Sequence, residues 1–392
     1  MEIRQLRQDD FEARMELSSY AFQYKPTSEQ LAALRAGFKA EREWGIFEDG
    51  TLKAKLGIIP LEIYLHGEKV KMGGIASVAS WPEERRKGHV AKLLTHALEQ
   101  MKQDGQAVSL LAPFSFNFYR KFGWEMFSDQ RVYKIAVDQL PARTATEGQV
   151  RRHAPAEAIA QMQEVYEAYA PSYNGMVVRH NDWWQKSVLR NPCYAALYYR
   201  PNGKPGGYLL YSIEQQVLTV KEMIYLDETA RKGLWTFIAN HDSMIKQVVA
   251  KGPADDWLPL QLADPRIGHE IMPYFMARIV DLPAFVAQYR FQAGGEAVRL
   301  RLQVEDIYAP WNDGEWILSV SAEGEGALAK AGAAPDHEPV IRCTIQILSA
   351  MMIGYQRPDK LWRGERFAAA EHDVERLERL LPQRQTYLLD YF

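Results

Sequence analysis

The stretch that decides the fold covers residues 75–129 and reads IASVASWPEERRKGHVAKLLTHALEQMKQDGQAVSLLAPFSFNFYRKFGWEMFSD. An apolar run at 75–81 predicts a strand, and a charged turn follows it. Beyond the turn, apolar side chains recur at the i, i+3, i+4, i+7 spacing of one buried helix face, namely Val90, Leu93, Leu94, Ala97, Leu98 and Met101. A second apolar run at 108–112 comes next. The predicted order is therefore strand, basic turn, helix and strand.

The turn between strand and helix is basic, because Arg85, Arg86 and Lys87 precede Gly88. The first turn of a helix has N–H groups without a partner inside the helix, and it carries a partial positive charge. Together with the three cationic side chains, these groups predict a site for an anion. The alternative is a solvated helix start that holds no ligand, because charged side chains mostly face water.

Two motifs in this stretch resemble a known family. The turn resembles the (Arg/Gln)-x-x-Gly-x-(Gly/Ala) pyrophosphate loop of the GNAT superfamily of N-acetyltransferases, with Val90 in place of the last small residue and Ala91 directly after it. Residues 118–124, FYRKFGW, are similar to the end of that fold's core, where a tyrosine faces the thioester. With the chain length and the aromatic C-terminus, these motifs resemble the Eis (enhanced intracellular survival) family of acetyltransferases over essentially the whole chain.

An internal repeat favours a duplicated fold. GluGluArgArgLysGly at 83–88 corresponds to GluThrAlaArgLysGly at 228–233, and each copy lies between an apolar strand and an apolar helix. Ala230 stands in place of Arg85, and no segment after Gly233 corresponds to the one around Tyr119. The second copy is therefore predicted to be structural, without the cofactor site.

The resemblance implies an α+β chain of two tandem GNAT-like mixed-sheet domains, followed by a sterol-carrier-protein-like α/β domain. The expected boundaries are 1–140 for the catalytic domain, 141–285 for the degenerate copy and 286–392 for the last domain. Residues 278–285 are expected to close the second domain. Within the first, Thr27 and Gln30 match the capping box that starts a helix.

The same resemblance implies the site and its co-substrate, acetyl-CoA, with no metal. Tyr119 is expected to be the general acid that protonates the departing thiolate, and the α-carboxylate of Phe392 the general base. The pantetheine arm would pair with Val78, Ala79 and Ser80, while Phe114 and Ser115 would line its other side where two strands diverge. The pyrophosphate would be held by Arg85, Arg86, Lys87, Gly88, His89, Val90 and Ala91.

The chemistry of the two catalytic candidates can be weighed against simple packing. A phenol has a pKa of about 10, above that of a thiol, and can donate its proton to a thiolate. An α-carboxyl with a pKa of about 3.5 is a weak base that burial strengthens. The alternatives are an aromatic cluster around Tyr119 and a terminus buried for packing alone. Residues 386–392, TYLLDYF, are apolar to the last residue, whereas free termini are commonly polar, so the terminus is expected to be buried.

Composition limits the class of protein. The 392 residues carry a net charge of −3, which gives no support for a nucleic-acid partner. The two cysteines, Cys193 and Cys343, have no metal-ligand spacing and predict no disulfide. The charged N-terminus predicts no signal peptide, and no apolar run approaches the roughly 18 residues of a membrane span. A cytoplasmic protein without a membrane partner is expected.

The function implied by the resemblance is an acetyl-CoA-dependent N-acetyltransferase. It would transfer acetyl to primary amines, of aminoglycoside or lysine type, directly within a ternary complex. The family also implies a homo-oligomer, a hexamer. The alternative is a protein that binds a lipid or another small apolar ligand in its last domain and retains a vestigial acetyltransferase site.

Overall fold

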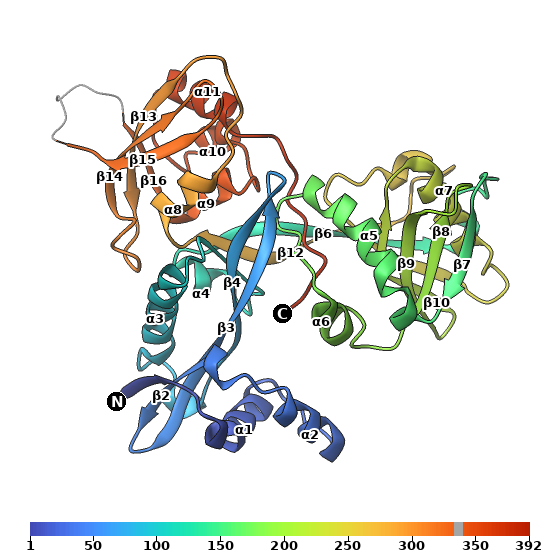
Figure 1. The fold of residues 1–392 in the computed structure, drawn as a ribbon, viewed down its shortest axis with the longest axis horizontal. Helices are drawn as coiled ribbons and strands as arrows, with labels where there is room; N and C mark the ends of the chain where they lie inside the picture. Colours follow the sequence, from blue (N-terminus) through green and yellow to red (C-terminus); the bar gives the residue numbers. More distant parts are fainter. Residues whose placement is uncertain (333–339) are drawn as a thin grey trace.

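The repeated order of strands and helices builds two similar units, and a third unit completes the chain (Figure 1). The computed structural model describes residues 1–332 and 340–392. The first unit contains β1 (Glu2–Gln5), α1 (Phe11–Ala21), α2 (Ser28–Ala36), β2 (Glu43–Glu48), β3 (Thr51–Leu65), β4 (Glu68–Ser80), α3 (His89–Gln103), β5 (Val108–Leu111), α4 (Phe116–Arg120) and β6 (Glu125–Ala136). The second contains β7 (Gln149–His153), α5 (Ile159–Tyr169), α6 (Asn181–Trp183), β8 (Tyr194–Tyr199), β9 (Pro205–Glu214), β10 (Val217–Tyr225), α7 (Glu228–Ala239), β11 (Gln247–Gly252) and β12 (Gly268–Ile279). The third contains α8 (Leu282–Gln288), β13 (Val298–Glu305), β14 (Gly314–Val320), β15 (Gly326–Lys330), β16 (Ile341–Thr344), α9 (Ile345–Met352), α10 (Pro358–Arg363) and α11 (Glu371–Leu380).

The first two units share one mixed sheet. Among the described residues twelve strands form it, in the order β1-β2-β3-β4-β5-β12-β6-β11-β10-β9-β8-β7. The pairs β4–β5 and β10–β11 are parallel and the other pairs antiparallel, at equivalent places in the two halves. The predicted duplication of a mixed-sheet fold is confirmed.

Each half of this sheet is completed by a strand from the other half. β12 follows the second unit's helix in the chain, yet it pairs with β5 of the first unit, with Met276 opposite Leu111 and Ile279 opposite Val108. Reciprocally, β6 pairs with β11. Residues 278–285 were expected to close the second unit, but Arg278 and Ile279 lie against the first one. An alternating strand pattern encodes which face is buried and not which strand lies alongside.

Helix α3 covers one face of the first half of the sheet. Leu93, Leu94, Ala97, Leu98 and Met101 are buried, as the periodicity predicts, and Val90 is half-buried. They pack with Ile75 and Leu111, the last paired residues of β4 and β5.

The predicted capping box is present at the start of α2, because the side chain of Thr27 accepts from Gln30 N and that of Gln30 from Thr27 N.

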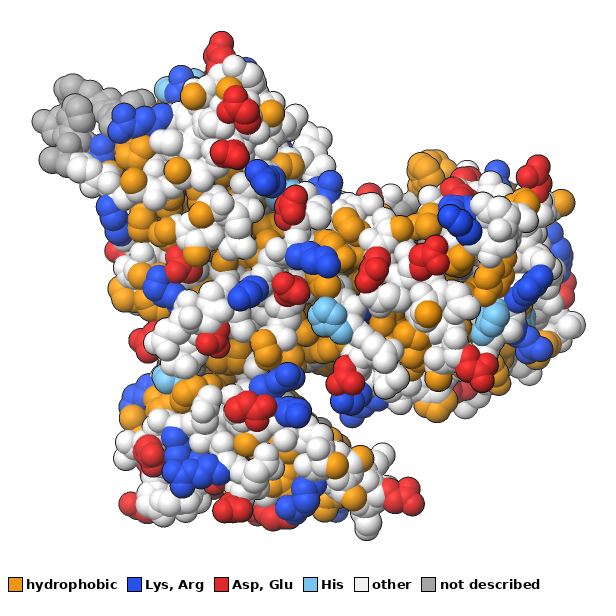
Figure 2. Space-filling model, viewed as in Figure 1, with side chains coloured by type: hydrophobic (Ala, Val, Ile, Leu, Met, Phe, Trp, Pro, Cys, Tyr) orange, Lys and Arg blue, Asp and Glu red, His pale blue; other side chains and the backbone are white. Residues whose placement is uncertain are grey.

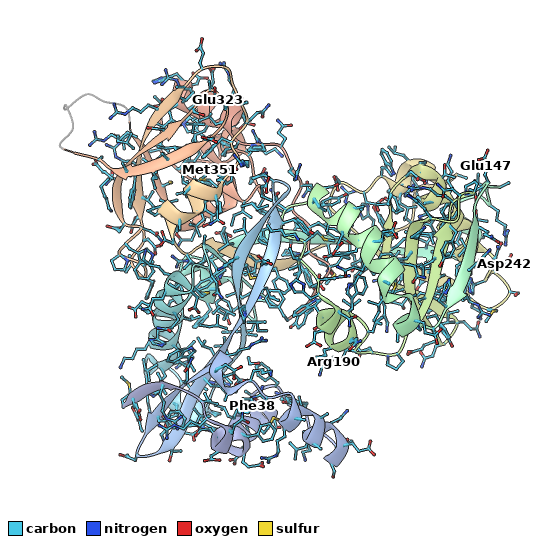
Figure 3. The ribbon with its side chains drawn as sticks, in the orientation of Figure 1. Phe38, Glu147, Arg190, Asp242, Glu323 and Met351 are labelled. Carbon is cyan, nitrogen blue, oxygen red and sulfur yellow. The ribbon has the colours of Figure 1, made fainter. Side chains whose placement is uncertain are left out.

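The opposite face of the same strands is covered by the third unit. Its sheet has the order β15-β14-β13-β16. Met351 of α9, labelled in Figure 3, is 2% exposed and belongs to a core that includes Met72 and Leu110 from β4 and β5. The sheet of the first unit thus separates two cores, one under α3 and one under the third unit.

The chain ends in the middle of the molecule, where the first two units meet (Figure 1). Residues 382–392 run back from the third unit, and Tyr387 N donates to Asn174 O of the second unit. Leu388 is fully buried, Asp390 is nearly so and Phe392 is half-buried, while Tyr391 is exposed. The predicted burial of the terminus is therefore confirmed except at Tyr391.

The surface is hollowed between the first and second units, below the end of the chain (Figure 2).

Over residues 1–332 and 340–392, no helix combines the length and the apolar character that crossing a membrane requires.

Candidate active site

The centre of the candidate site is a gap between β4 and β5. The two strands pair only from Met72 opposite Val108 to Ile75 opposite Leu111. β5 ends there, whereas β4 continues to Ser80 along β3. The edge of β4 that faces β5 consequently pairs with no described strand over residues 76–80, and N–H and C=O groups on such an edge can pair with an extended ligand.

A bulge turns β4 at the start of this free edge. The register with β3 shifts between Ala76 and Ala79, and Ser77 has a φ of +54°. Lys55 of β3, which is fully buried, donates to the carbonyl oxygen of Ser77 at 3.2 Å and contacts Glu43 at 3.3 Å. Burial lowers the pKa of Lys55 to about 8 in spite of the Glu43 carboxylate. This buried lysine therefore holds the bulge that precedes residues 78–80.

The start of α3 offers unfilled backbone donors. Its N-cap is Gly88, with a φ of +83° and no side chain to bond the first N–H groups. Arg85 and Arg86 are exposed, and neither guanidinium forms an ion pair with a described residue. Lys87 is exposed too and contacts Glu84 at 2.8 Å. A helix start that lacks a side-chain cap and is flanked by guanidinium groups without a described partner has the chemistry to hold an anion.

The second copy has filled the same position with its own side chain. α7 has Asp227 as N-cap, and its carboxylate accepts from Ala230 N at 2.8 Å and from the Arg200 guanidinium at 2.7 Å. An anionic ligand would meet a carboxylate there. The difference between Gly88 and Asp227 agrees with the prediction that the second copy has no cofactor site.

Three groups near the basic turn also have the geometry to surround a metal ion. Glu48, Glu84 and His89 each place one ligand atom within 4.8 Å of the others. Glu84, however, is already bonded to Lys87 and lies 3.3 Å from Lys53. Two ammonium groups beside the carboxylate disfavour a cation, and the Lys87 hydrogen bond lowers the Glu84 pKa.

Tyr119 lies on the α3 side of the sheet, in the short helix after β5. The ring is 3% exposed and packs edge-on against Phe114 and Phe118, and burial raises the pKa of its hydroxyl. This hydroxyl bonds to no described residue, yet it is not among the polar atoms shut off from solvent. A buried phenol with a free, reachable O–H is available to a ligand.

The turn that follows Tyr119 is held from the second half of the chain. Arg278 of β12, which is fully buried, donates to Phe122 O and pairs with Asp306 at 2.5 Å. Gly123 has a φ of +94°, and a Cβ there would collide with the Arg278 guanidinium. The exchange of β12 thus fixes the segment that carries Tyr119.

Phe392 lies on the other side of the sheet. Its ring contacts Phe275 with a centroid distance of 5.0 Å and Trp183 at 6.4 Å, and it covers Gly74 of β4. Gly74 and Ile75 are neighbours, so they face opposite sides of the strand, and Ile75 packs in the core of Tyr119. Tyr119 and Phe392 therefore lie on opposite faces, both at the point where β4 and β5 part.

Comparison with known proteins identifies the units. Residues 2–127 and residues 175–279 each match the Acetyltransferase (GNAT) domain, and residues 282–389 match the Sterol carrier protein domain. The chain is a GNAT-type N-acetyltransferase. GNAT domains take their acyl group from an acyl-CoA, so this acetyltransferase uses an acyl-CoA donor.

Proteins similar to this acetyltransferase match most or all of its length. An uncharacterized N-acetyltransferase of Streptomyces coelicolor is 24% identical over 354 residues, which cover 83% of this chain and 84% of the relative. A probable N-acyltransferase from Enterococcus faecalis is 29% identical with a TM-score of 0.92, covering 100% of this chain and 99% of the other. Eis1 from Mycobacterium abscessus has the same fold, with a TM-score of 0.81, 21% identity and full coverage of both chains. The predicted resemblance to Eis-type acetyltransferases is confirmed in the fold.

The predicted cofactor residues of the acetyltransferase lie at the end of β4, at the start of α3 and directly after β5. Residues 78–80 form the free edge of β4, residues 85–91 the turn and first helical turn, and Phe114 and Ser115 follow β5. Some side chains have other partners: Ser115 caps α4, accepting from Phe118 N, and His89 is buried beside Glu84. Val90 and Ala91 pack toward the core under α3. At these positions the backbone is the part that can reach a ligand.

Two residues that support the site were not predicted. The signal for Lys55 was a lysine inside an apolar strand, which has to find a buried partner. Arg278 carried no local signal, because its partner Phe122 lies in the other half of the chain.

Proposed function

We propose that this enzyme transfers acetyl from acetyl-CoA to a primary amine, directly and within a ternary complex. One observation carries the proposal. The uncapped start of α3 and the gap between β4 and β5 are adjacent in the first unit, whereas the equivalent helix start of the second unit is filled by Asp227. A diphosphate at Gly88 would direct the pantetheine arm along residues 78–80, and the thioester would reach the gap.

In this proposal Tyr119 is the general acid and the Phe392 carboxylate is the general base, which is supported by their places on opposite faces of the sheet where β4 and β5 part. The amine nitrogen attacks the thioester carbon and the C–S bond breaks; the ammonium proton passes to the Phe392 carboxylate, directly or through a water, and the thiolate takes a proton from Tyr119. Burial raises the pKa of Tyr119, so the phenol is protonated before transfer. The thiolate would form in the same apolar surroundings, which raise the pKa of a thiol as well.

The remaining parts of the proposal rest on the resemblance to the Eis family. They are an acceptor of aminoglycoside or lysine type, a homo-oligomeric assembly with six subunits, a cytoplasmic location and a reaction without a metal. The units are proposed to divide at 140 and 285. Three separate family matches, over residues 2–127, 175–279 and 282–389, support a division into three units. Binding of an apolar ligand as the main function is not favoured, because both acetyltransferase domains are matched.

The proposal is tested by titrating the protein with acetyl-CoA in a calorimeter and by following thiol release with a panel of primary amines. We expect heat on titration and amine-dependent release of free thiol. A protein that shows neither heat nor a thermal shift with acetyl-CoA would contradict the proposed donor. A chain extended by two residues beyond Phe392 tests the base, and is expected to bind acetyl-CoA and to lose most of its activity.

A further inference from the structure

A buried ionic cluster in the second unit contacts the end of the chain. Arg179 is 1% exposed in its side chain and forms two hydrogen bonds of 2.8 Å with Glu222 of β10. Its Nε bonds the carboxylate of Asp390 at 3.0 Å. Asp390, two residues before the end of the chain, is 2% exposed in its side chain. One guanidinium from the second unit therefore binds the last segment of the chain in the interior.

Neutral donors complete this cluster. The indole N–H of Trp183 donates to the Asp390 carboxylate at 2.7 Å, and the Tyr274 hydroxyl donates to the Asp390 carbonyl oxygen at 3.1 Å. Tyr208 donates its hydroxyl to Glu222. Both the carboxylate and the carbonyl oxygen of Asp390 thus have hydrogen-bond partners.

Such a cluster is a poor way to stabilise a fold. Desolvation of three charged groups opposes their attraction, and apolar residues of similar volume stabilise a core as well or better. What a fully bonded cluster does provide is one defined position for its members. The cluster is therefore better explained by the position that it gives to the chain end.

Asp390 and Phe392 are linked through a shared neighbour. Trp183 contacts both residues, with its N–H on the Asp390 carboxylate and its ring 6.4 Å from the Phe392 ring. Gly74 and Phe275 also contact the Phe392 ring. Tyr391, which lies between Asp390 and Phe392 in the chain, is 69% exposed. The last residue is thus held by its own ring and by the residue two positions before it.

We propose that Arg179 and Asp390 are positioning residues, which hold the terminal carboxylate at the gap between β4 and β5. The second unit, whose own helix start is filled by Asp227, would then serve the first unit by placing its base. This inference rests on the proposed role of the Phe392 carboxylate. Neither residue is expected to touch the substrate.

The first experiment is Asp390→Asn in the full-length protein. The asparagine keeps the size of the side chain and an oxygen for Trp183, but it loses the charge that binds Arg179. We expect kcat to fall about tenfold to a hundredfold, as small misplacements of a reacting group do, with an unchanged KM for acetyl-CoA. Asp227→Asn is the matched control, because it also neutralises an aspartate paired with an arginine in the second unit and keeps a helix-capping side chain. Its kcat should equal that of the wild type.

A second experiment shows whether Asp390 acts through the terminal carboxylate. In the chain extended beyond Phe392, Asp390→Asn should lower the residual rate no further, because residues that act as one unit are not additive. The inference would be overturned if Asp390→Asn lowered kcat in the extended chain by the same factor as in the unextended one. An unchanged kcat in the single variant would overturn it too. If the extension alone leaves activity intact, the proposed base itself is wrong. If thermal unfolding shows that Asp390→Asn is not folded, Trp183→Phe replaces it. This variant removes one hydrogen bond to Asp390 and keeps an aromatic ring beside Phe392, and the same outcomes apply to it.

Discussion

The ring of Phe392, the last residue, lies on Gly74 of β4, and a Cβ at position 74 would come within 2.7 Å of its Cε2 atom. Only a residue without a side chain leaves room for the ring at this point of the strand. Gly74 is also the next-to-last residue of β4 that pairs with β5, so the terminal ring marks the place where the strands part. This contact ties the end of the chain to the strand that would bind the cofactor.

Gly74→Ala should therefore move Phe392 and lower kcat by about tenfold or more, if the terminal carboxylate is the base as proposed, since its shift would misplace the reacting group. The free energy of unfolding should fall by about 1–3 kcal/mol, as it does at other overpacked sites. Steady-state kinetics and denaturant unfolding measure the two effects. Acetyl-CoA affinity should be unchanged, because the methyl group lies on the face opposite to α3, and a variant with wild-type kcat would show that the ring position is unimportant.

Tyr119→Phe removes the free hydroxyl and preserves the ring packing against Phe114 and Phe118. We expect kcat to fall by about a hundredfold or more, the usual contribution of a general acid, with the acetyl-CoA affinity retained. Tyr289→Phe is the control, because Tyr289 is a buried tyrosine in the core under the third unit. Equal turnover for the two variants would remove Tyr119 from the mechanism.

Gly88→Asp should reproduce in the first unit what Asp227 does in the second. Space is available, since a Cβ at Gly88 meets no atom within 4 Å, and aspartate tolerates the left-handed conformation better than most residues. A carboxylate at the helix start should weaken acetyl-CoA binding by roughly tenfold or more. Gly88→Asn has the same shape without the charge, so calorimetry should show a much smaller loss for it. Equal losses would indicate a steric effect and not an anion site.

Lys55 should give the protein a specific pH dependence of stability. Its pKa is lowered to about 8 in the folded protein from an ordinary 10.5, so between these values the unfolded chain binds more protons. The stability of the wild type should then rise with pH relative to Lys55→Met, by at most about 1.4 kcal/mol per pH unit. Below pH 8 the lysine is protonated in both states and the difference should be constant. Denaturant unfolding of both proteins at pH 7, 8, 9 and 10 measures the difference between their free energies of unfolding. A difference that is the same at all four pH values would contradict a lowered Lys55 pKa.

Local patterns were enough to predict the parts of the site that are continuous in the chain. The buried face of α3, the glycine before it and the tyrosine after β5 lie within one stretch, where helix periodicity and turn chemistry act over a few residues. The Thr27–Gln30 capping box is equally local. The supporting contacts of Lys55 with Ser77 and of Arg278 with Phe122 depend on partners distant in the chain, and a sequence pattern does not specify such partners.

The sequence by itself determined that the fold is duplicated, that only the first of the two copies carries both arginines and the tyrosine of the predicted site, and that the chain end is apolar enough to be buried. Only the tertiary structure decided that β6 and β12 exchange between the halves and that Arg179 holds Asp390. The physical reason is that periodicity and caps act between neighbours along the chain, whereas strand partners and buried charge pairs are selected by the packing of the whole molecule.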